Sequence, residues 1–182
     1  FIEGTVEHVD VEQRTIRVGA AEGEPLELSY DHVVIALGAT TNTSMIPGSQ
    51  HARTFKTIGD GFLIRNHLIE RLERADVETD PQRRREMLTI VVIGGGLVGV
   101  ELLGELSAFV HTELKYYPRI QTSDLVFHLF EAGNRLVPEA KPFLAEYAST
   151  ILRRRGGQLH TSTAVQAIEP GAVRWKDGEV RA

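Results

Sequence analysis

The chain has 182 residues, of which 42% are apolar and 25% charged, as in an ordinary globular protein with one good core or one domain and part of another. Its net charge of −5 argues against nucleic acid as the main partner. The absence of cysteine excludes a disulfide, a thiolate metal site and a redox dithiol within these residues, and the uncharged apolar run 87–100 is too short to span a bilayer.

The first part of the chain predicts a small antiparallel β-meander. β-Branched residues are frequent in 5–11 and 15–18, which a polar turn separates, and a third strand is expected at about 26–29. The simplest role for this meander is a stabilising appendage. Because the chain starts at Phe1, with no lead-in before the strand pattern, we expect a fragment.

Residues 33–39, Val-Val-Ile-Ala-Leu-Gly-Ala, predict a buried strand that ends in small residues. Small residues at a strand end let a backbone or a ligand come close, so a ligand contact at Gly38 and a core strand with a tight exit both stay open. Residues 41–54 are polar, contain Pro47-Gly48, and make the best linker in the chain.

A helix is predicted next, opening at the pair Thr57 and Asp60, which has the spacing of a capping box. Its apolar residues share one face, and it should run to about Ala75. The charged stretch 76–85 follows. Its three arginines at 83–85 fit either a phosphate-binding patch or, the favoured interpretation, a solvated run before a buried strand.

The most informative stretch is 88–106. A β-branched run at 89–93 leads into three glycines, and leucines and valines then recur at helical spacing, which predicts strand, tight turn and helix. Three glycines fill G-x-G-x-x-G, in which the first permits the turn, the second admits a pyrophosphate and the third lets helix and strand pack closely. The positive end of the helix faces the phosphates. The expected dinucleotide contacts are Gly94, Gly95, Gly96, Leu97, Val98 and Gly99.

A second strand, 125–130, ends at the acidic residue that this fingerprint requires, Glu131. A carboxylate there binds the adenosine ribose hydroxyls and repels a 2′-phosphate, which favours NAD over NADP. Glu131 follows Gly96 by 35 residues rather than about 20, and we expect 109–124 to form a longer helix and a surface insertion. A plain surface acid is the alternative, and nearby Arg135 keeps NADP open.

The last part of the chain predicts a helix at 142–153 that Gly156-Gly157 ends, and a short strand at 159–161. Residues 163–175 then echo the hairpin at 5–18, which indicates the end of one unit and most of a similar second one, although short β patterns also repeat by chance. The histidines show no metal-ligand spacing, so no metal site is expected: His111, His128 and His160.

Together these features resemble the flavoprotein pyridine-nucleotide(-disulfide) oxidoreductases, and most of all the type II NADH dehydrogenases (NADH:quinone oxidoreductases). The resemblance rests on Tyr30 to Gly38, Ile46-Pro47-Gly48, Gly94 to Leu106 and Leu129 to Gly133. It implies an α/β fold, a Rossmann-like parallel sheet with a β-meander. Residues 1–50 would be the C-terminal part of the first FAD-domain segment, and 51–182 an NADH-binding domain truncated before its last strand.

In the whole enzyme, the resemblance implies, NADH reduces FAD by hydride transfer and FAD reduces a quinone or another acceptor. The catalytic candidate is Glu101, which would lie near flavin and nicotinamide and orient the carboxamide or relay a proton; a carboxylate favoured by the helix dipole is the alternative. Four residues of the FAD portion would contact the flavin nucleotide: Val6, Ala36, Leu37 and Gly38. No earlier G-x-G-x-x-G is present, so this chain should not hold FAD tightly and should be inactive alone.

Two other functions stay open: another branch of these flavoproteins, such as an NADH oxidase or ferredoxin reductase, and a module that senses NADH without turnover. The lack of cysteine in the NADH-binding part disfavours the thioredoxin-reductase branch. We expect a cytoplasmic location, with peripheral contact at the inner face of a membrane only through segments outside this chain. An open-ended sheet and an uncovered meander predict self-association or strand exchange.

Overall fold

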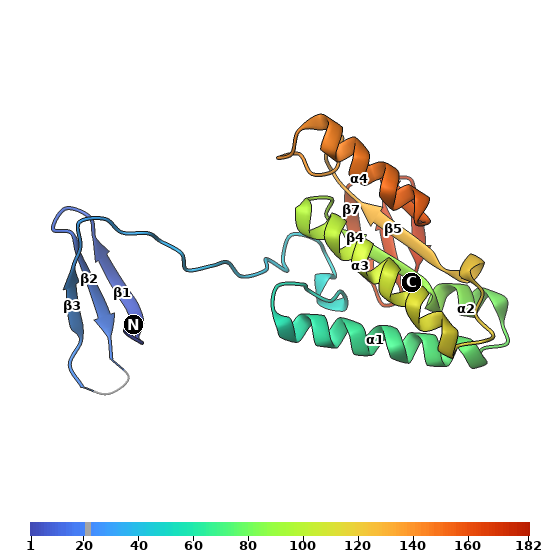
Figure 1. The fold of residues 1–182 in the computed structure, drawn as a ribbon, viewed down its shortest axis with the longest axis horizontal. Helices are drawn as coiled ribbons and strands as arrows, with labels where there is room; N and C mark the ends of the chain where they lie inside the picture. The colour runs from blue at the N-terminus through green and yellow to red at the C-terminus, as the bar shows by residue number, and fades with distance from the viewer. Residues whose placement is uncertain (21–22) are drawn as a thin grey trace. The chain divides into compact units, whose positions relative to one another are not determined.

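A computed structural model describes residues 1–20 and 23–182, which form two compact units, Phe1–Thr40 and Thr41–Ala182 (Figure 1). The sequence suggested a domain boundary at residue 50, whereas the two compact units divide between Thr40 and Thr41. Residues 41–50 group with the second unit because their chain is tied to it: the Ile168 N–H donates to the Pro47 carbonyl at 2.9 Å.

The first unit contains the predicted antiparallel meander, with β1 (Thr5–Asp10), β2 (Thr15–Gly19) and β3 (Leu26–Ser29) in that order. The turn between β1 and β2 closes because the Asp10 carboxylate accepts the N–H groups of Glu12 and Gln13, at 2.9 and 2.7 Å. Arg14, at φ 55°, completes the turn, and its carbonyl accepts the N–H of Tyr30 at 3.0 Å.

The predicted buried strand at 33–39 is wrong. The segment has no regular secondary structure, and Val34, Ile35 and Leu37 are 86%, 72% and 80% exposed. A strand of continuous apolar residues needs neighbours to pair its backbone groups and to cover its faces. Among the described residues of the first unit, the meander is the only sheet, and its strands do not pair with residues 33–39.

The second unit is built on a parallel sheet of β4 (Thr89–Ile93), β5 (Val126–Phe130) and β6 (Gly157–His160), in the order β4-β5-β6. β5 is the central strand and all five of its residues are buried, as expected for a parallel strand covered on both faces. The strand, turn and helix predicted around the glycines are confirmed, and with them the α/β fold. The helices are α1 (Ile58–Val77), α2 (Pro81–Met87), α3 (Leu97–Glu113) and α4 (Pro142–Arg154).

Local signals explain where these helices begin. Thr57 and Asp60 form the predicted capping box of α1: the Thr57 hydroxyl accepts the Asp60 N–H at 3.2 Å, and the Asp60 carboxylate accepts the Thr57 N–H at 2.7 Å. The short helix α2 lies in the charged stretch and was not predicted. It forms because the Asp80 side chain caps the N–H groups of Gln82 and Arg83, with Pro81 in the first turn.

The expected insertion after α3 is confirmed, since the helix reaches Glu113 and two 3-10 turns, Leu114–Tyr116 and Thr122–Asp124, follow before β5. The chain then ends in a second meander of β7 (Val165–Glu169), β8 (Ala172–Trp175) and β9 (Gly178–Arg181). The sequence did not reveal β9, a short strand with one apolar residue. The 3-10 turn Ser49–His51 lies against β7. Within the described ranges, no helix is long and apolar enough to cross a membrane.

Candidate functional site

The glycine turn joins the carboxyl end of β4 to α3. Gly94 has φ 107°, a backbone conformation that side chains disfavour, and its N–H donates to the Phe130 carbonyl at the end of β5 at 2.8 Å. A Cβ on Gly99 would lie 1.8 Å from the Gly94 carbonyl oxygen. Both positions are therefore restricted to glycine by the backbone itself, the first by its φ and the second by close packing of helix on turn.

The two glycines between them differ in their surroundings. A Cβ on Gly95 would meet Leu136 at 2.6 Å and Glu131 at 2.7 Å, so these two side chains already fill the space that a side chain at Gly95 would need. A Cβ on Gly96 would meet a single atom, an oxygen of Glu139 at 3.9 Å, which leaves open space at its Cα. A bulky ligand group can approach the backbone at Gly96 and not at Gly95.

The N-terminus of α3 is free to receive an anion. Gly96 is the N-cap residue, no side chain caps the helix, and the first turn holds no acidic residue. The first N–H groups of a helix have no partner within it and carry a partial positive charge. The arrangement of strand, open glycine and uncapped helix end is the one in which phosphate groups bind.

Glu131 lies directly beside this turn. Its two carboxylate oxygens accept the N–H groups of Gly95 and Gly133, both at 2.6 Å. Its backbone is fixed as well, because its N–H donates to the His160 carbonyl at 2.8 Å and its carbonyl accepts the Thr163 N–H at 2.9 Å. The acid is thus held at the carboxyl ends of β4 and β5, despite the long insertion that precedes β5.

The segment that packs against the glycine turn was not predicted from the sequence. The Val137 N–H donates to the Gly95 carbonyl at 2.7 Å, and Leu136, 1% exposed, packs against Gly95. Val137 adopts φ 45°, which a β-branched residue rarely does. The nearby Arg135 guanidinium donates to the Pro138 carbonyl in its own loop. An apolar pair directly after a polar turn was the one available signal.

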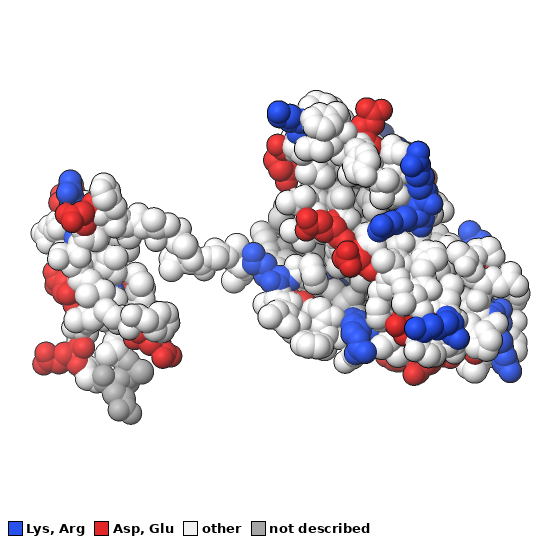
Figure 2. Space-filling view, in the orientation of Figure 1, with Lys and Arg blue, Asp and Glu red and all other residues white. Residues whose placement is uncertain are grey.

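The remaining predicted residues fall into two groups. Leu97 and Val98 are about half exposed in the first turn of α3, and Glu101 and Glu105 are exposed further along the same helix. Figure 2 shows acidic side chains on the surface over α3. The second group lies in the first unit, with Val6 at a bulge of β1 and with Ala36, Leu37 and Gly38 in the exposed segment. The structure therefore gathers the glycine turn, Glu131 and Glu101 in one unit.

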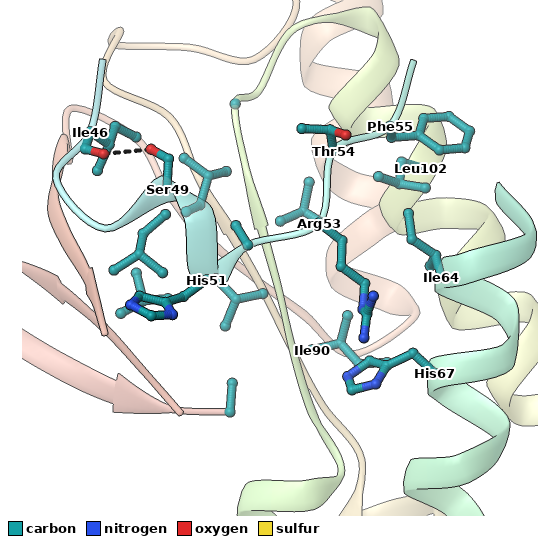
Figure 3. A pocket seen from close by; sticks show the side chains of 18 of the residues that line it. Ile46, Ser49, His51, Arg53, Thr54, Phe55, Ile64, His67, Ile90 and Leu102 are labelled. Atoms are coloured by element: carbon teal, nitrogen blue, oxygen red, sulfur yellow. Dashed lines mark hydrogen bonds between the residues drawn. The ribbon is translucent and has the colours of Figure 1, made fainter. Parts of the chain in front are cut away.

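A cavity of about 1010 Å³ lies along the edge of β4, and Figure 3 shows side chains from residues 46–55, α1 and α3 around it. The cavity reaches Gly94 and Val98 at one end, but most of its length runs along β4. His67 of α1 lines it, and burial, followed by the charge of Arg53, lowers the pKa of that imidazole. The described residues contain no cluster of three or more metal-ligating side chains.

Comparison with known proteins places these features in context. A family model described as pyridine nucleotide-disulphide oxidoreductase matches residues 1–181. The external alternative NADH-ubiquinone oxidoreductase of Yarrowia lipolytica is 31% identical over 96% of this chain and 31% of its own length. External NADH-ubiquinone oxidoreductase 2 of Saccharomyces cerevisiae is 32% identical over 96% of this chain and 33% of its own length.

Solved structures of related proteins have the same fold. NDH2 of Plasmodium falciparum, in a complex with NADH, superposes with a TM-score of 0.74 at 26% identity, and the alignment covers 93% of this chain and 36% of that one. The water-forming NADH oxidase of Lactobacillus brevis, at 21% identity and a TM-score of 0.57, shares the fold. The chain spans about a third of the length of the curated relatives it matches.

Proposed function

The chain belongs to the pyridine nucleotide-disulphide oxidoreductase family, and from this premise we propose that it is the NADH-binding part of a flavoprotein like the type II NADH:quinone oxidoreductases. In the whole protein, FAD would accept a hydride from NADH and pass electrons to a quinone or another acceptor. The part of that reaction assigned to this chain is to bind NADH and to hold its nicotinamide end in place.

The observation that supports this proposal most strongly is the position of the Glu131 carboxylate on the glycine turn. The N–H groups of Gly95 and Gly133 each donate to one of its oxygens and hold it beside the turn. Each oxygen retains a lone pair for a ribose hydroxyl, while a 2′-phosphate at the same place would meet a fixed negative charge. NADH is therefore the preferred nucleotide.

The pyrophosphate would lie over Gly96 and the uncapped start of α3, where the backbone is open and the N–H groups point outward. Glu101 follows one turn later on the exposed surface of the same helix. We assign to it the role of orienting the nicotinamide carboxamide. The FAD contacts assigned to Val6, Ala36, Leu37 and Gly38 belong to the first unit and to the complete protein.

The proposal is tested by fluorescence titration of the chain with NADH and with NADPH. NADH should bind clearly more tightly. Glu131→Gln removes the charge and leaves one neutral acceptor for two N–H donors, so it should weaken NADH binding about tenfold, which corresponds to about 1.4 kcal/mol, and should narrow the preference over NADPH. Glu113→Gln, at the far end of α3, is the matched control and should behave as wild type.

Equal affinities for the two nucleotides, unchanged by Glu131→Gln, would contradict the role of Glu131. Failure of the wild-type chain to bind either nucleotide, while its circular dichroism shows it folded, would contradict the assignment of a complete nucleotide site to this chain.

A further inference from the structure

A second carboxylate, that of Glu139, lies beside the open part of the glycine turn. A carboxylate oxygen of Glu139 is the one atom that a Cβ on Gly96 would meet within 4 Å, at 3.9 Å. The pyrophosphate of the proposed nucleotide site needs this same open space over Gly96. A bound nucleotide and the Glu139 carboxylate would therefore be direct neighbours.

The loop that carries Glu139 is fixed to the glycine turn. The Val137 N–H donates to the Gly95 carbonyl at 2.7 Å, and the Ala140 N–H donates to the Val137 carbonyl at 2.9 Å. Leu136, which is 1% exposed, packs against Gly95 from the same loop. The backbone on both sides of Glu139 is thus held close to the turn, and the position of its carboxylate follows from the fold.

No direct ion pair neutralises this carboxylate. The ion pairs found within residues 1–20 and 23–182 do not include Glu139, so neither Arg135 nor Lys141, the cations nearest to it in the sequence, is paired with it. The Arg135 guanidinium donates instead to the Pro138 carbonyl, and its Nη1 atom is buried, without a hydrogen-bond partner among the described residues. Arg135 is therefore turned into the loop and away from the space over Gly96.

Two acids consequently flank the proposed phosphate site. Glu131 accepts the N–H of Gly95, and Glu139 lies beside Gly96, the next residue, whose Cα atom is about 3.8 Å from that of Gly95. A 2′-phosphate placed at Glu131 would lie within about 10 Å of the Glu139 carboxylate, which is the Debye length at 0.1 M salt. NADPH carries about two more negative charges than NADH, so a charge at Glu139 repels it more strongly.

We infer that Glu139 is a second specificity-determining residue of the nucleotide site, and that it acts by repulsion, whereas Glu131 also binds the ribose. This inference rests on the NADH site proposed above. The Glu139 carboxylate opposes the pyrophosphate of both nucleotides and, in addition, the 2′-phosphate of NADPH. Discrimination against NADPH is therefore divided between two acids, and the second of them makes no contact that NADH needs.

Fluorescence titrations with NADH and NADPH test this role through the ratio of the two dissociation constants. At an ionic strength of about 0.05 M, Glu139→Gln should bring the ratio for NADPH over NADH at least about threefold closer to one, and Glu139→Lys about tenfold, because the lysine changes the local charge by two units. At about 1 M salt the Debye length falls to about 3 Å, and the ratios of wild type and variants should converge.

Two matched variants separate this effect from size and from net charge. Glu139→Asp keeps the charge and should resemble the wild type. Glu113→Gln removes the same charge at the far end of α3 and should leave the ratio unchanged. Glu139 is exposed, so all of its variants should fold, which circular dichroism checks.

An unchanged ratio in Glu139→Lys at low salt would overturn the inference. So would a change that persists at about 1 M salt, or one that Glu113→Gln reproduces. If NADH binds and Glu131→Gln weakens it while Glu139→Lys has no effect on the ratio, this inference alone fails. If the folded wild-type chain binds neither nucleotide, the proposed function fails and the inference fails with it.

Discussion

Acidification should destabilise the protein through one buried imidazole. His128 lies in the central strand β5, is 8% exposed, and has its Nδ1 atom 2.9 Å from Nε2 of His160. The two rings stack on one another and on Phe130. Burial, followed by the positive charges of His160 and Arg85, lowers the pKa of His128 from 6.5 to about 4. The folded protein therefore holds this ring neutral.

The sign and size of the effect follow by linkage. The unfolded chain takes up a proton on His128 below pH 6.5, whereas the folded chain takes it up only near pH 4. The stabilisation is thus fully present above pH 6.5 and is lost as the pH falls towards 4. A lowering of the pKa from 6.5 to about 4 corresponds to about 3 kcal/mol of unfolding free energy.

Urea unfolding at a series of pH values, for wild type and for His128→Phe, isolates this effect because the carboxylates are common to both. The wild type should lose about 3 kcal/mol relative to the variant between pH 7 and pH 4. The exposed His32→Phe variant should follow the wild type. If the free energies of wild type and His128→Phe fall in parallel across this range, the reasoning about His128 is refuted.

Two further predictions concern the turn and the first helix. Gly99→Ala should cost about 3 kcal/mol in thermal unfolding because its Cβ would lie 1.8 Å from the Gly94 oxygen, whereas Gly96→Ala should fold as wild type and weaken NADH binding; equal stability of the two variants would contradict the packing argument. Thr57→Ala should lower the unfolding free energy by about 1 kcal/mol in urea, since it removes the cap of α1, and an unchanged midpoint would show that the capping box contributes nothing.

Local chemistry made much of the second unit predictable. The Thr57–Asp60 pair predicted the start of α1, and the β-branched run before the glycines predicted β4, the turn and α3. Each of these signals acts within a few residues of its effect. Glu131 was predicted because the dinucleotide-binding fingerprint ends its second strand in an acid, and the hydrogen bond from Gly95 shows that this acid lies beside the turn.

The features that were not predicted correctly depend mostly on contacts with residues distant in the chain. Residues 33–39 have the composition of a buried strand, but composition cannot supply the sheet that such a strand needs. Leu136 and Val137 pack against the glycine turn because of a backbone hydrogen bond and a positive φ at Val137. Neither feature can be predicted from the residue types. The short helix α2 was hidden because Pro81 reads as a break, although it is well suited to a first helical turn.

The central prediction for this protein is the position at which NADH binds. Amide resonances of the isotope-labelled chain should be followed by NMR during an NADH titration. We predict that the largest shifts fall on Gly95, Gly96, Leu97 and Val98 and on Glu131, and that NADPH at the same concentration produces smaller ones. Shifts confined to the β4 cavity or to the first unit, with the glycine turn unmoved, would contradict the proposed nucleotide site.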